Sequence, residues 1–146
     1  MDKSEILKTV SNKISEKIQK LEQLIAETRA SNNDTKSSMG DKYETGREML
    51  QQEINHLQRQ LNEALNQQNS IQKLNDSENL SADFGALVQT SNGWFYIATS
   101  VGEIKLENRK IITISPESPL AKAMNGKKSG ETFIVNNLSQ TIQNIW

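Results

Sequence analysis

Three acidic residues in the first half of the chain have a spacing that could support metal chemistry. Asp41 and Glu44 stand three positions apart, so on a helix their carboxylates would share one face. Carboxylate oxygens are the hard ligands that Mg²⁺ prefers, but two of them cannot complete its near-octahedral shell alone. Asp34 is a third candidate, closer to the apex of the polar segment 31–40. The structural alternative is that such acids complement a helix dipole in its first turn.

Histidine and cysteine chemistry has almost no support in this sequence. The chain contains no cysteine, which excludes disulfides and thiolate metal sites and fits a reducing cytoplasm. His56 is the only histidine, and it flanks the apolar positions Ile54 and Leu57 of a predicted helix. We therefore expect no cofactor bound by the chain alone.

The composition favours a small two-part protein that does not bind nucleic acid directly. The 146 residues are 34% hydrophobic and 5% aromatic, which is lean for a single compact core and suits long exposed helices. A formal charge of −1 lacks the basic excess of proteins that neutralise many phosphates. The first residues contain no apolar signal segment and no run reaches membrane-spanning length, so we expect a cytoplasmic protein without membrane contact.

Residues 1–78 show the spacing of a coiled coil. Apolar residues recur every three or four positions, which averages 3.5 and places them on one seam of each of two helices. Between the two seams, the small polar residues of 31–40 are expected to halt the first helix, and Ser37 or Ser38 could cap the second. Arms of similar length then predict an antiparallel two-helix hairpin with its acidic tip around 31–44. The seam residues are Leu7, Val10, Ile14, Ile18, Leu21 and Ile25, then Leu50, Ile54, Leu57, Leu61, Ala64, Gln68 and Ile71.

Residues 79–146 follow strand and turn patterns instead, with one short helix. Ser91-Asn92-Gly93 predicts a hairpin turn, and Ser118 followed by Pro119 predicts the start of a helix that ends at Gly126. We expect a compact α+β domain with an antiparallel sheet and most aromatic side chains in its core. The predicted strands are 84–90, 94–98, 103–106, 110–114, 130–135 and 141–146.

Two stretches resemble the Gre family of bacterial transcription elongation factors. The first, from Ile114 to Thr132, contains Ser-Pro-Leu-Ala-Lys-Ala-Met-Asn-Gly-Lys-Lys-Ser-Gly-Glu. It is similar to the family's Ser-Pro-(Leu/Ile)-(Ala/Gly)-(Arg/Lys)-Ala-Leu-x-Gly-Lys-x-x-Gly-(Asp/Glu), which lies between two strands. The second is at the tip, where Gly40-Asp41-Lys42-Tyr43-Glu44 resembles the family's Gly-Asp-x-x-Glu. Tyr43 to Glu48 also resembles the Tyr-x-x-x-Arg-Glu that follows that motif, and the two tip alignments exclude each other by a few residues.

The resemblance implies a factor that binds RNA polymerase and is not itself an enzyme. Gre factors insert their hairpin through the secondary channel of the polymerase, where the tip acids help to hold a second Mg²⁺. The polymerase then cuts backtracked RNA, so the factor meets nucleic acid only indirectly, at the RNA 3′ end. On this chain the tip acids would be Asp41 and Glu44, with Asp34 replacing the first acid in the second alignment. The docking element would be Ser118, Pro119, Leu120 and Lys122, and we expect a monomer.

Three other functions stay open at this point. A tip that lacks one acid could plug the channel and inhibit transcription without promoting cleavage. The second half also resembles the fold of FK506-binding prolyl isomerases, which allows an isomerase or chaperone with a helical handle. Lastly, the hairpin could open into one long dimerising helix, which would make the chain a structural adaptor.

Overall fold

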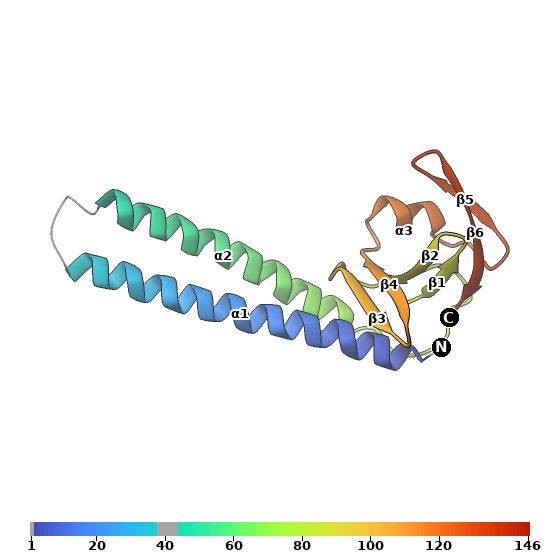
Figure 1. Cartoon of the computed structure of the whole chain (residues 1–146), viewed down its shortest axis with the longest axis horizontal. Coiled ribbons are helices and arrows are strands. Elements are labelled where there is room, and N and C mark those ends of the chain that lie inside the picture. Colours follow the sequence, from blue (N-terminus) through green and yellow to red (C-terminus); the bar gives the residue numbers. More distant parts are fainter. Residues whose placement is uncertain (1, 38–43) are drawn as a thin grey trace. The chain divides into compact units, whose positions relative to one another are not determined.

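Two long helices precede six strands and a short helix (Figure 1). The structure is a computed structural model. It describes the backbone of residues 2–37 and 44–146, and the side chains of residues 2–32 and 46–146. In chain order the elements are α1 (Lys3–Ser37), α2 (Glu44–Ile71), β1 (Leu87–Thr90), β2 (Gly93–Ile97), β3 (Glu103–Leu106), β4 (Arg109–Ile114), α3 (Pro119–Met124), β5 (Thr132–Val135) and β6 (Leu138–Ile145).

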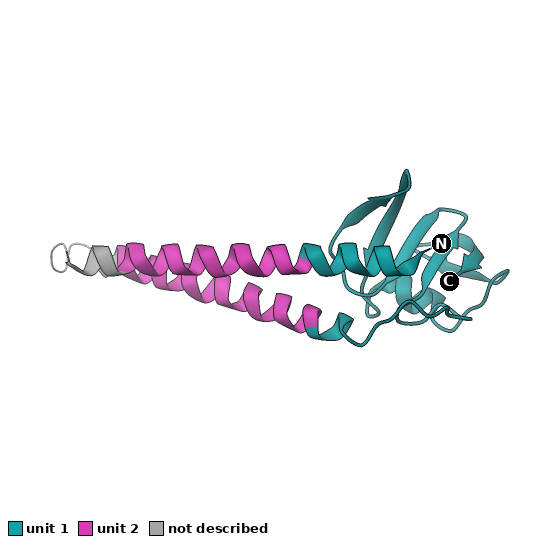
Figure 2. Ribbon diagram, turned by 90° about the horizontal axis from the view of Figure 1, so that it is seen from below, with its two compact units in different colours: residues 1–13, 69–146 teal, residues 14–68 magenta. Residues whose placement is uncertain are grey.

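The chain divides into two compact units (Figure 2). The hairpin unit comprises residues 14–68, and the sheet unit comprises residues 1–13 and 69–146. Residues 3–13 thus belong to the sheet unit, although they are part of the same helix as the hairpin arm. The division into functional domains at residue 78 stays a prediction.

The hairpin unit is an antiparallel pair of helices, as the seam predicts. Its two arms run side by side in both views (Figures 1 and 2). Each helix buries one stripe, and charged or amide side chains cover the other faces, so packing between the arms stabilises both helices. The buried apolar residues of this unit are Ile14, Ile18, Leu21, Ile25, Ile54, Leu57, Leu61 and Ala64.

The first helix ends within the polar segment 31–40, as the sequence predicts, but Ser37 is not the cap of the second helix, and Ser38, the other predicted cap, lies outside the described residues. Helix α1 continues through Ser37, so Ser37 is helical and does not cap α2. Asn32 is buried at 8% exposure, four positions after Thr28 and seven after Ile25, which continues the seam spacing. Packing at this position outweighs the low helix propensity of the neighbouring polar residues, because propensity is only a weak preference.

In the sheet unit, six strands form one sheet in the order β3-β4-β2-β1-β6-β5. Four of the five pairings are antiparallel, but β2 and β4 are parallel, with Trp94 beside Ile111 and Ile97 beside Ile114. The prediction of an α+β fold is confirmed, and the prediction of a purely antiparallel sheet is wrong for this one pairing. After β2, residues 98–102 lead the chain to the edge strand β3, which does not pair with β2. Strand β4 then returns between them and pairs with both.

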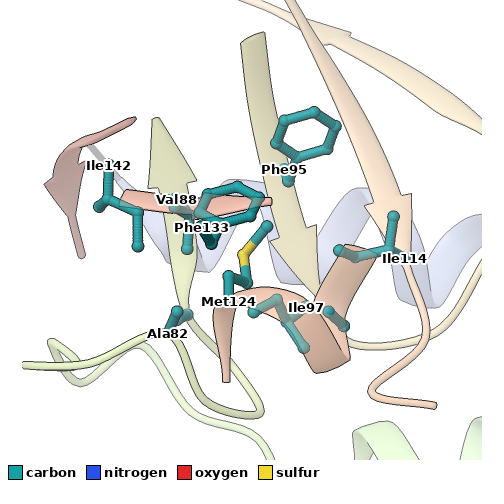
Figure 3. Close-up of a cluster of buried hydrophobic side chains, with 10 residues drawn as sticks. Ala82, Val88, Phe95, Ile97, Ile114, Met124, Phe133 and Ile142 are labelled. Atoms are coloured by element: carbon teal, nitrogen blue, oxygen red, sulfur yellow. The ribbon is translucent and has the colours of Figure 1, made fainter. Parts of the chain in front are cut away.

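Both faces of the sheet are covered. On one face, side chains from five strands and α3 form the cluster shown in Figure 3, which includes Phe95, Met124 and Phe133. Leu87, Tyr96, Ile104 and Ile111 are also buried, and Tyr96 alternates with Phe95 along β2, so it faces the other way. The first turns of α1 contribute the fully buried Ile6 and Val10 to the same unit. Leu7, predicted in the seam, is only half-buried, because this end of α1 packs within the sheet unit.

Candidate functional site: the hairpin tip and the Ser-Pro helix

The acidic tip residues lie at the ends of the two hairpin helices or between them. The backbone of Asp34 belongs to α1, and Glu44 is the first residue of α2. Asp41 lies outside the described residues, as do the side chains of Asp34 and Glu44. Their roles stay predictions. The helical backbone at Asp34 does place it in the arm rather than at a loop apex.

Near the end of α1, a polar residue replaces the apolar residues of the seam. Asn32 takes a buried position, and its Oδ1 has no hydrogen-bonding partner among the described groups. One turn earlier, the Thr28 hydroxyl donates to the carbonyl oxygen of Leu24 at 2.7 Å. A single buried asparagine in a coiled coil fixes register at some cost in stability. Asn32 is not among the predicted seam residues, although the spacing 25, 28, 32 could have shown it.

The Ser-Pro element forms the capped helix that the sequence predicts. The Ser118 Oγ accepts a hydrogen bond from the Ala121 N–H at 3.1 Å, and Pro119 occupies the first turn. The Ser118 carbonyl oxygen accepts from the Lys122 N–H at 2.9 Å. Gly126, at φ +75°, follows the C-cap and ends the element.

The four predicted docking residues sit differently on α3. Pro119 and Lys122 are exposed, and Ser118 is half-buried. Leu120 is also half-buried and packs against the core cluster, so it offers less apolar surface than an exposed leucine would. Ala121 and Met124 are buried, and they hold the helix to the sheet. The exposed part of the element is therefore its start and its Lys122 side.

A second hydrogen-bonded turn precedes the helix and fixes an acidic side chain. The Ser115 Oγ donates to the Glu117 carboxylate at 2.5 Å and accepts from the Glu117 N–H at 3.1 Å. The hydrogen bond from Ser115 lowers the pKa of Glu117, and the Lys122 ammonium contributes in the same direction. Glu117 therefore stays charged at neutral pH, beside the exposed start of α3.

Among the described residues, no three His, Cys, Asp or Glu side chains are grouped closely enough to hold a metal ion. His56 is exposed, and its Nε2 lies 3.0 Å from Gln60 Nε2 on the same helix. Within the described ranges, no helix is long and apolar enough to cross a membrane.

The aromatic side chains of the sheet unit mostly form its core. Phe95, Tyr96 and Phe133 are buried, as predicted, whereas Phe84 is 36% exposed and lies before β1 rather than in a strand. Trp94 is half-buried and stacks on Trp146, with ring centroids 5.3 Å apart. The Arg109 guanidinium lies 4.9 Å from the centre of the Trp94 ring.

Comparisons with known proteins give matches only among solved structures. No family model matches the chain, and no curated protein matches it. One similar structure is described as that of the transcription factor Gfh1, at 13% identity and a TM-score of 0.37, covering 92% of each chain. Another is Gfh1 of Thermus aquaticus, at 15% identity and 0.36, also covering 92% of each chain. A third is GreA factor homolog 1 of Thermus thermophilus, at 17% identity and 0.36, covering 97% of this chain and 93% of that one.

Proposed function

We propose that this chain is a Gre-type factor that binds RNA polymerase in the cytoplasm, as a monomer, and acts on its active centre through the secondary channel. The observation that carries the proposal is the Ser-Pro helix, folded and capped as the Gre resemblance requires, in a chain that begins with a helical hairpin. The hairpin supports the proposal because the buried apolar side chains described for residues 14–32 and 46–68 lie on a single seam.

In this proposal the hairpin tip and the start of α3 have separate tasks. The start of α3 docks on the polymerase, with Ser118 and Pro119 shaping the surface and Lys122 supplying a positive charge. The tip acids Asp41 and Glu44, with Asp34 as the alternative first acid, act beside the polymerase's own catalytic residues. Their carboxylate oxygens fit Mg²⁺ in chemistry. A shared Mg²⁺ would supply activation of water and neutralisation of the developing phosphate charge.

The test is cleavage of RNA in a stalled, backtracked elongation complex, with and without the protein. We expect the protein to bind polymerase and to accelerate cleavage, and the double variant Asp41→Asn/Glu44→Gln to lose about tenfold or more of that acceleration. The matched control is Glu53→Gln, which removes an exposed carboxylate from α2 away from the tip.

Two results would change the proposal. If the double variant binds and accelerates cleavage like the wild type, the assignment of the tip acids is wrong. If the wild type binds and slows elongation without accelerating cleavage, the chain blocks the channel instead.

The isomerase alternative predicts turnover of a proline-containing peptide. The burial of Phe95, Tyr96 and Phe133 in the core argues against an aromatic pocket.

A further inference from the structure

The first turn of α1 buries a charged side chain in the sheet unit. Lys3 is only 3% exposed. Its ammonium donates hydrogen bonds to Asn79 Oδ1 at 2.8 Å and to the carbonyl oxygen of Gly85 at 3.0 Å. Burial lowers the pKa of Lys3, and the carboxylates of Glu78 and Asp76 oppose that shift. Lysine is almost never fully buried unless it is paired, because desolvating an ammonium is costly.

The two acceptors are themselves fixed in place. The Gly85 N–H donates to the carbonyl oxygen of Ile97, at the end of β2, at 2.7 Å. Gly85 has φ +91°, and a Cβ added there would lie 2.9 Å from Leu74 Cδ2, so this backbone suits only glycine. The side chain of Asn79 also donates, at 3.5 Å, to the carbonyl oxygen of Phe84. The segment 79–85 thus holds both acceptors of the Lys3 ammonium, the Asn79 Oδ1 and the Gly85 carbonyl oxygen, in place.

The same segment contacts the Ser-Pro helix on its other side. The N–H of Ala82 donates to the carbonyl oxygen of Lys127, just after α3, at 2.8 Å. Ala82 is 1% exposed and belongs to the core cluster together with Ala121 and Met124 of α3. Residues 79–85 therefore connect the first turn of α1 with the end of α3, entirely within the sheet unit.

We propose that Lys3 is a positioning residue that joins the start of the hairpin helix to the α3 element through residues 79–85. The inference rests on the proposed function in taking α3 as the polymerase-binding element. Because residues 3 to 37 form one helix, the hairpin arm begins at this joint. An apolar side chain at position 3 would be cheaper to bury, but it would not select one position. An ammonium aimed at two fixed oxygens sets both the rotation and the axial position of the first turn.

The joint is tested first on the free protein by amide hydrogen exchange of Lys3→Met. The matched control is Lys8→Met, at an exposed position one turn and a half further along α1. In Lys3→Met we expect the amides of Ala82 and Gly85 to exchange about tenfold faster or more, while the β1–β2 amides keep their protection. Exchange at Ala82 and Gly85 within about twofold of the control would overturn the joint.

The positioning role is tested with polymerase, by measuring affinity and maximal effect separately. We expect Lys3→Met to bind polymerase within about threefold of the wild type, but to give at saturation about one fifth or less of the tip-dependent effect on RNA cleavage or elongation. An unchanged effect at saturation, or a loss explained by affinity alone, would overturn the role. If the wild type does not bind polymerase, the proposed function fails, while the exchange experiment still decides whether the joint exists.

A second variant covers the case in which Lys3→Met does not fold. Asn79→Ala removes one acceptor from a half-buried position and leaves the lysine in place. By itself, Asn79→Ala should accelerate exchange at Ala82 and Gly85 about threefold or more relative to the Lys8→Met control, and no acceleration would overturn the joint. Where Lys3→Met folds, the factors should not multiply in the double variant, because both changes break the bond between Lys3 and Asn79. Factors that multiply would show that the two side chains act independently, which would overturn the joint.

Discussion

The hairpin unit and the sheet unit bury their apolar side chains in different ways. In the hairpin unit, every buried apolar side chain described in residues 14–32 and 46–68 lies on one seam, so most neighbouring positions on the same helix remain accessible. In the sheet unit both faces of a six-stranded sheet are covered. Among the described side chains, the sheet unit encloses the ammonium of Lys3 and the hydroxyl of Tyr96, and the hairpin unit encloses the amide of Asn32. The hairpin seam thus buries an uncharged amide, whereas the sheet unit can also bury a hydrogen-bonded charge.

The largest effect is expected from Phe95→Ala in the core cluster. Phe95 is 6% exposed, and truncating a buried phenylalanine costs about 3–5 kcal/mol of unfolding free energy. Both tryptophans, Trp94 and Trp146, lie in the sheet unit, so their fluorescence reports on that unit alone. We expect the fluorescence transition in denaturant to shift while most of the helical circular dichroism persists.

The control for this prediction is Ile134→Ala, which shortens a side chain that is 69% exposed and should change stability by less than about 0.5 kcal/mol. If Phe95→Ala shifts the fluorescence and helical transitions together by the same amount, the two units unfold as one. The two units would then differ in how their side chains pack but not in when they unfold.

The reverse experiment is Leu57→Ala in the seam. Leu57 is 7% exposed, and its truncation should cost the hairpin about 2–4 kcal/mol, somewhat less than a phenylalanine core change. The helical signal should melt earlier, and the tryptophan transition should stay in place. Arg59→Ala, at an exposed position of the same helix, is the matched control. An unchanged helical transition would mean that the seam contributes little to the hairpin.

A smaller effect is expected from Ser118→Ala at the start of α3. Loss of an N-cap costs about 1 kcal/mol, because the Ala121 N–H loses its acceptor. The sheet unit should be destabilised by that amount, measured by tryptophan fluorescence, without change in the hairpin. Affinity for polymerase should fall as well, whereas Ser139→Ala, an exposed serine in β6, should change neither. Normal affinity in Ser118→Ala would remove α3 from the docking surface.

The hairpin could be predicted from the sequence in most respects, because a seam of period 3.5 is a local pattern. The predicted seam residues between Ile14 and Ile25, and those between Ile54 and Ala64, are buried as that spacing predicts. The end of α1 at Ser37 lies within the predicted segment 31–40, but the helix continues through most of that segment because Asn32 packs in the seam against the propensity of its neighbours. Local residue types cannot show which preference is stronger.

The sheet unit could be predicted only in part, because its pairings join distant residues. Turn residues located the strands, but β1 begins at Leu87 rather than at Phe84. The reason is the turn in which the Ala86 N–H donates to the Asp83 carbonyl oxygen, next to Gly85. Sequence patterns do not state that β2 and β4 are parallel neighbours. The same holds for Lys3, whose burial depends on oxygens that follow it by 76 and 82 positions.

The smallest effect at neutral pH, and the most specific one, is expected from Tyr96→Phe. Tyr96 is fully buried, and its hydroxyl has no hydrogen-bonding partner among the described groups. Removing an unpaired buried hydroxyl should lower stability by less than about 1 kcal/mol or raise it.

The effect of Tyr96→Phe should also depend on pH, because burial raises the pKa of Tyr96 from 10.0 to about 12. Between these two values the unfolded chain loses the phenolic proton while the folded protein keeps it, so the free energy of unfolding falls as pH rises. The difference in stability between wild type and Tyr96→Phe, measured by tryptophan fluorescence, should therefore be constant below pH 10 and then move against the wild type. A difference that stays constant up to pH 12 would mean that the hydroxyl is solvated, and that the sheet unit is less tightly closed than the comparison with the hairpin requires.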